Sequence, residues 1–112
     1  MEKHITITLD TKDGHLIFDI LGKTSASLGD IVEIPGNAKL IYDGTYTRKG
    51  FGFPDTLNFT LVFGMGVASS LVATWLYDKF KGKTEKVAIN RAVIELDKGE
   101  IKRIIEEEIK KE

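Results

Sequence analysis

Hydrophobic and polar residues alternate along several stretches of the amino-terminal half, which is the pattern of half-buried strands. Apolar positions continue on both sides of Asp13-Gly14, so residues 5–21 are predicted to form a β-hairpin with its turn at this pair. Residues 31–34 and 38–42 form a second predicted hairpin, joined across Pro35-Gly36-Asn37. We therefore predict a region of antiparallel strands at this end of the chain.

After a further predicted turn at Asp43-Gly44, a run without any charged residue covers residues 56–77. Residues 57–63 alternate with period two and predict a strand, and from Gly66 onward the apolar period becomes that of a helix. The run is therefore predicted to be a strand, a turn and a helix. The alternative is a single membrane-spanning helix, because about twenty uncharged residues are enough to cross a bilayer.

The predicted helix that starts at Gly66 has two contrasting faces. Its apolar arc consists of Val67, Ala68, Leu71, Val72, Trp75, Leu76 and Phe80. Its small-residue face consists of Gly66, Ser69, Ser70, Ala73, Thr74 and Tyr77. Small side chains let another backbone approach closely, either a sheet or a second helix. From this face we select these candidate partner-binding residues: Gly66, Ser69, Ser70, Ala73 and Tyr77.

The carboxy-terminal part is predicted to contain two short β runs, residues 86–90 and 92–96, which form a hairpin or one bent strand. Asp97 and Glu100 have the spacing of a helix-capping box, in which the Asp side chain accepts from a backbone amide and the Glu side chain reaches back. A helix should follow and end at about Lys111.

This last helix is predicted to be amphipathic and to dock on the sheet by its isoleucines, Ile101, Ile104, Ile105 and Ile109. On its wet side, ion pairs are expected between Glu106 and Lys110 and between Glu107 and Lys111. The whole pattern predicts an α+β fold with an antiparallel β-rich amino-terminal half, an apolar central helix, a short β element and a carboxy-terminal amphipathic helix.

Composition narrows the class of protein. The 112 residues are predicted to form a single small α+β domain, residues 1–112. Sixteen basic and seventeen acidic residues give a formal charge of -1, so no global field attracts nucleic acid. The chain has no Cys, which removes disulfides, thiol catalysis and cysteine metal sites. The first residues enter a strand pattern at once, without the apolar core of a signal peptide, so a cytoplasmic location is expected.

One short motif points to nucleic acid. Residues 49–53 (Lys-Gly-Phe-Gly-Phe) resemble the core of the RNP1 motif of RNA-recognition and cold-shock domains, in which alternate aromatic residues stack on bases. The resemblance implies a weak single-stranded nucleic-acid binder that uses Arg48, Lys49, Phe51 and Phe53. Pro54 departs from the motif and would stop a central strand. The interpretation that we prefer is a flexible loop whose phenylalanines pack inward.

Catalytic and metal-binding patterns lack support in the sequence. His4 and His15 could approach each other across the first predicted hairpin, but nothing fixes a further ligand, so both are predicted to be surface residues. No Ser/His/Asp order, catalytic carboxylate pair or activated lysine stands out. We therefore predict no enzyme activity, no metal and no cofactor.

The run from Gly66 to Glu108 resembles the small effector-associated constant-component domains of bacterial conflict systems. The resemblance lies in a helix of small residues that ends in Trp75-Leu76, two β runs and an acidic, isoleucine-rich helix. It implies a non-enzymatic accessory domain that contacts an effector protein. Our hypothesis is a small cytoplasmic interaction module that binds another protein or itself. The alternatives are a membrane-anchored protein and the weak nucleic-acid binder.

Overall fold

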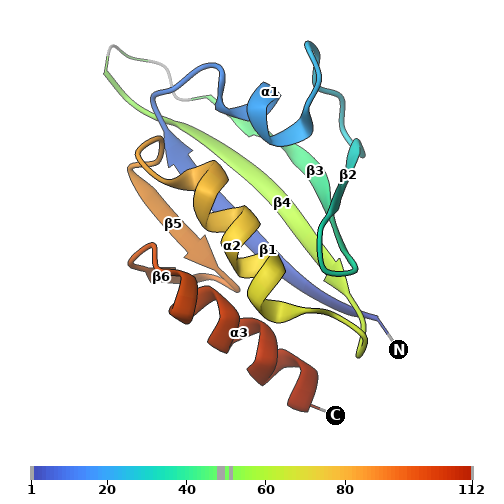
Figure 1. Cartoon of the computed structure of the whole chain (residues 1–112). Helices are drawn as coiled ribbons and strands as arrows, with labels where there is room; N and C mark the ends of the chain where they lie inside the picture. Colours follow the sequence, from blue (N-terminus) through green and yellow to red (C-terminus); the bar gives the residue numbers. More distant parts are fainter. Residues whose placement is uncertain (1, 48–49, 51, 112) are drawn as a thin grey trace.

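The computed structural model of the chain describes residues 2–47, 50 and 52–111. Its elements are β1 (Lys3–Thr11), α1 (Leu16–Leu21), β2 (Ile31–Ile34), β3 (Ala38–Tyr46), β4 (Asp55–Phe63), α2 (Ser69–Phe80), β5 (Lys86–Ile89), β6 (Ala92–Ile94) and α3 (Lys98–Lys110). The strands form one antiparallel sheet in the order β2-β3-β4-β1-β5-β6. The three helices lie against the same face of this sheet (Figure 1). The predicted α+β fold is confirmed.

β1 lies in the interior of the sheet because it pairs with β4 on one side and with β5 on the other. Its register with β4 runs without interruption from Lys3↔Phe63 to Thr11↔Asp55. The side chains of β1 that point towards the helices, Ile5, Ile7 and Leu9, are fully buried. The core is therefore the layer between this face of the sheet and the helices.

The predicted hairpin over residues 5–21 is wrong in its second half, because Leu16–Leu21 form the helix α1. Asp13 starts the helix: its side chain accepts a hydrogen bond from the amide of His15, and its carbonyl accepts from the amide of Leu16. Leu16 and Ile20 are buried at a spacing of four residues, so an apolar pattern that also fits a strand forms a helical face here. β1 therefore pairs with β4 and β5 and not with the strand predicted after Asp13-Gly14.

The hairpin of β2 and β3 is confirmed, and its turn reaches the helical layer. Gly36 has a φ of 105° and its carbonyl accepts a hydrogen bond of 2.8 Å from the amide of Ala68, the residue before α2. The side-chain amide of Asn37 donates to the carbonyl of Gly66 at 3.2 Å. The predicted turn at Asp43-Gly44 is wrong: β3 continues to Tyr46, and a register shift between Tyr42 and Gly44 marks a bulge.

The uncharged run over residues 56–77 is divided between β4 and α2, so the prediction of a strand, a turn and a helix is confirmed. The helix begins at Ser69 rather than at Gly66, because the chain after β4 first turns towards Gly36. It is twelve residues long. Among the described residues, no helix is both long and apolar enough to cross a membrane.

α2 packs on the sheet through Val72, Leu76 and Phe80, all of which are fully buried. α3 packs beside α2 (Figure 1), and Ile101 and Ile105 are its buried residues. Ile104 and Ile109 are partly buried against the same core, which confirms the predicted isoleucine stripe. Leu71 remains exposed, so the apolar arc predicted for the helix is wider than the surface that the fold covers.

β5 and β6 form a hairpin, which settles the two alternatives for this segment. Asp97 caps α3 as predicted, since its side chain accepts from the amide of Glu100 at 3.0 Å. The carboxylate of Glu100 bonds to Arg103 and does not reach back to the cap. The solvent-facing ion pairs differ from the predicted ones. Glu107 pairs with Arg103, one turn before it, and Lys111 pairs with Glu108.

Candidate interaction surfaces

The far face of the sheet, which points away from the helices, is rich in hydroxyl and amide groups. These side chains hydrogen-bond across neighbouring strands, with distances of 3.4 Å from Thr8 to Asn58 and 2.8 Å from Thr56 to Asp10. The hydroxyl of Thr60 donates to the carboxylate of Asp43 at 2.5 Å, across the bulge in β3. The polar side chains of this face therefore satisfy one another by hydrogen bonds, and the surface that they form contains both polar and apolar groups.

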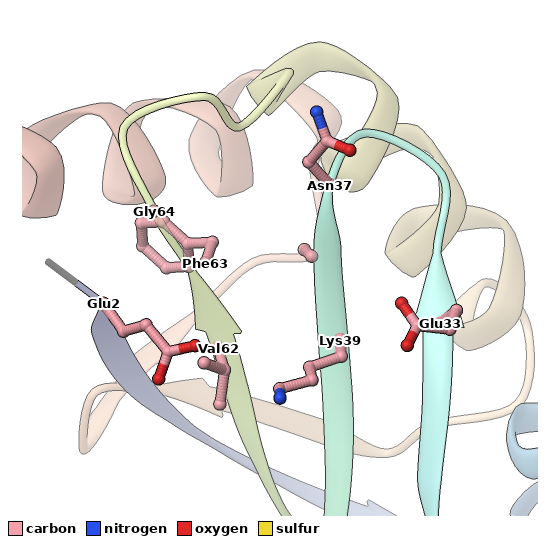
Figure 2. A pocket seen from close by; sticks show the side chains of 8 residues that line it. Glu2, Glu33, Asn37, Lys39, Val62, Phe63 and Gly64 are labelled. Atoms are coloured by element: carbon pink, nitrogen blue, oxygen red, sulfur yellow. The ribbon is translucent and has the colours of Figure 1, made fainter.

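A shallow hollow lies at one end of the far face, next to the turn between β2 and β3. Figure 2 shows Glu2, Val62, Lys39 and Glu33 side by side, from the segment before β1 and from strands β4, β3 and β2. The hollow has a volume of about 270 Å³ and opens widely to solvent. Because Lys39 lies between carboxylates in this row, the charges alternate in sign, and the hollow suits a polar protein contact better than an isolated anion or cation.

Exposed apolar side chains stand at the borders of the far face. Ile31 on β2, Tyr46 at the end of β3 and Val93 on β6 are 50%, 64% and 63% exposed. Their register partners Ile41, Thr56 and Ala88 place all three side chains on this face. None of these three residues is among the predicted site residues, although the alternation within each strand indicates which of its side chains share a face.

The small-residue face of α2 is divided by the packing of α3. Ala73 is 1% exposed. The hydroxyl of Ser69 donates to Glu106 of α3 at 3.3 Å, and the ammonium of Lys98 in α3 lies 5.3 Å from the centre of the Tyr77 ring. These three of the five candidate partner-binding residues thus line the contact with α3, whereas Gly66 and Ser70 are exposed.

At the tip of the hairpin between β3 and β4, Phe53 is 56% exposed, so the interpretation that it packs inward is wrong. A Cβ atom at Gly50 would lie 2.7 Å from the ring of Phe53, so this ring lies beside the backbone of Gly50. Arg48, Lys49 and Phe51, the other residues of the RNP1-like motif, lie outside the described residues. The exposed pair of aromatic residues described at this end of the sheet is therefore Tyr46 and Phe53.

Several ionisable side chains of the described residues form structural contacts, and the ion pair between Asp19 and Lys83 is the clearest example. Within residues 2–47, 50 and 52–111, no group of His, Asp and Glu side chains could hold a metal ion. The ammonium of Lys83 bonds to the carboxylate of Asp19 at 2.6 Å and ties α1 to the segment after α2. This hydrogen bond and the charge of Lys83 lower the pKa of Asp19 from its ordinary value of 3.8. His4 and His15 are both exposed, and their elements do not pair.

Comparisons of the chain with protein-family models, curated proteins and solved structures find no match.

Proposed function

We propose that the chain is a non-enzymatic interaction module that binds another protein through the sheet surface left uncovered by the helices. The observation that carries this proposal is the one-sided cover of the sheet: all three helices lie on one face (Figure 1). The far face spans six strands and has exposed apolar residues at its borders. Apolar side chains set among satisfied polar groups are typical of surfaces that form non-obligate protein contacts.

The small-residue face of α2 contributes less to this proposal than the sequence suggests, because Ala73 is already enclosed between helices. Gly66 and Ser70 remain accessible and form a secondary candidate surface beside the exposed Leu71. The finer proposal, an accessory domain of bacterial conflict systems that contacts an effector protein in the cytoplasm, is supported by the resemblance of residues 66–108. Self-association is the alternative form of the same function.

A pair of matched variants tests the proposal. Thr8→Arg places a long cation at the centre of the far face, and Ser70→Arg places the same side chain on the exposed part of α2. Each immobilised variant is used to capture proteins from the native host, and the recovered proteins are compared by quantitative mass spectrometry. We expect a partner that is recovered with the parent and with Ser70→Arg but lost with Thr8→Arg. Loss with Ser70→Arg alone would move the binding surface to α2.

A second candidate function, binding of single-stranded nucleic acid, is favoured by the exposed rings of Tyr46 and Phe53 at one end of the sheet. Exposed aromatic rings stack on bases without sequence preference, and Arg48 and Lys49 supply positive charge between them in the sequence. Binding of a labelled single-stranded oligonucleotide that weakens steeply with salt would support this candidate, because phosphate contacts release counterions.

A further inference from the structure

β6 is a border strand of the sheet, and the turn before it determines which of its backbone groups point outwards. Asn90 and Arg91 have φ values of 56° and 70°, as in the two-residue type I′ turn of a tight hairpin. The residues that flank such a turn, Ile89 and Ala92, exchange both of their hydrogen bonds. Since the pattern alternates, the amide and the carbonyl of Val93 point away from β5, towards the open border of the sheet.

A channel runs beside this border, between β6 and α3. One part of it, about 260 Å³, has the apolar side chains of Ile89, Ala92, Ile94 and Ile104 among its lining residues. The other part, about 450 Å³, follows the chain from Val93 to Asp97. Ile94 and Glu100 line both parts, so the two parts lie next to each other. Outward-pointing backbone groups next to a channel that has apolar side chains in its lining are what an added β-strand requires.

The rim of the channel is acidic. Its lining residues include five carboxylates, Glu95, Asp97, Glu100, Glu107 and Glu108, and two cations, Arg103 and Lys111.

The two cations are already engaged by carboxylates of the same helix. Arg103 bonds to Glu100 and to Glu107, and these hydrogen bonds raise its pKa above the ordinary value. The ammonium nitrogen of Lys111 lies 3.3 Å from a carboxylate oxygen of Glu108. The channel therefore keeps a net negative charge and should attract a cationic occupant.

We propose that the border of β6 accepts an extended, basic segment of the partner protein as an additional strand of the sheet. The segment pairs with the backbone of Val93, places one apolar side chain over Ile94 and Ile104, and places Lys or Arg two residues to either side, next to the carboxylates of the rim. This inference rests on the proposed function and names the chemistry of the partner. A second copy of the chain is a poorer occupant, because a two-fold axis at β6 would bring the same carboxylates together.

The test uses the whole chain, labelled with ¹⁵N, and two capped peptides of the form Thr-Lys-Thr-Val-Thr-Lys-Thr and Thr-Glu-Thr-Val-Thr-Glu-Thr. We expect the lysine peptide to shift the amide resonances of Val93 and Glu95 and to slow hydrogen exchange at Val93, because that amide gains a partner. The glutamate peptide should leave both resonances unchanged. Titration of the shifts gives the affinity for each variant.

Two charge reversals form a matched pair. Glu95, changed in Glu95→Lys, lines the channel. Glu33, changed in Glu33→Lys, lies on β2 at the opposite border of the sheet. We expect Glu95→Lys to weaken binding of the lysine peptide about fivefold, since it replaces an attraction by a repulsion at an exposed site. Glu33→Lys should leave the affinity unchanged. Val93→Pro removes the outward amide without removing a bond of the hairpin and should weaken binding about fivefold or more.

Several results would overturn strand addition at β6: equal binding of both peptides, shifts that map to β2 or to the centre of the far face, or no binding of the lysine peptide. Dimerisation of the chain that is lost in Val93→Pro would identify a second copy as the occupant instead. These failures are separable from failure of the proposed function, because a partner that is lost with Thr8→Arg but retained with Glu95→Lys would still bind the far face.

Discussion

Replacement of Gly36 by alanine is expected to cost the folded domain about 3 kcal/mol or more, because two unfavourable terms act together. A Cβ atom at this position would lie 2.8 Å from the carbonyl oxygen of Ala68 and 3.0 Å from the side chain of Val72. In addition, the φ of 105° is a conformation that residues with a side chain rarely adopt. The contact cannot open without separating the turn between β2 and β3 from the start of α2.

Gly82 supplies the matched control for this prediction. It also has a positive φ, of 72°, but a Cβ atom there would meet nothing within 4 Å. Gly82→Ala should therefore cost only the left-handed conformation, about 1 to 2 kcal/mol. Denaturant unfolding of both variants measures the difference. Equal losses of stability in the two variants would show that the turn does not clamp α2.

Ala73→Leu is expected to lower the stability of the isolated monomer by about 1 to 3 kcal/mol, because the larger side chain overpacks the contact between α2 and α3. Ser70 is exposed on the same helix, so Ser70→Leu should change stability by less than about 0.5 kcal/mol. Thermal unfolding at several protein concentrations checks both values. The loss for Ala73→Leu should be independent of concentration, since α3 belongs to the same chain.

The opposite pattern would contradict this assignment of the small-residue face. If the Ala73→Leu variant has the melting temperature of the parent chain but no longer associates, this face binds a partner and is not enclosed by α3. Stabilisation through a partner depends on concentration, so the concentration series separates the two cases.

Local sequence patterns predict those elements of this fold that contain their own signals. Alternation identifies β4, and the capping residue Asp97 fixes the start of α3. α1 was missed because six apolar-rich residues satisfy a strand and a helix equally well, and its helical form depends on Asp13 and on burial of Leu16 and Ile20. Such short segments are decided by tertiary packing.

The arrangement of the sheet and the candidate sites could not be predicted in the same way. β1 pairs with strands that lie far along the chain, with contacts such as Ile7↔Phe59 and Ile7↔Ile89. Long-range pairing leaves no local signal beyond alternation, which fits any partner strand. Without the strand order, neither the one-sided cover of the sheet nor the open border at Val93 can be deduced from the sequence.

Lysine reactivity provides the most direct test of the claim that the uncovered side of the sheet binds a partner. Lys39 and Lys86 lie on the far face, as their pairing with Val62 and Asp10 shows, whereas Lys81 and Lys102 lie on the side of the helices. The chain is acetylated alone and in complex with the captured partner, and the modified lysines are quantified by mass spectrometry. We predict that Lys86 is protected in the complex and that Lys81 and Lys102 react as before. Protection of Lys81 and Lys102 with unchanged reactivity of Lys39 and Lys86 would contradict the proposed function.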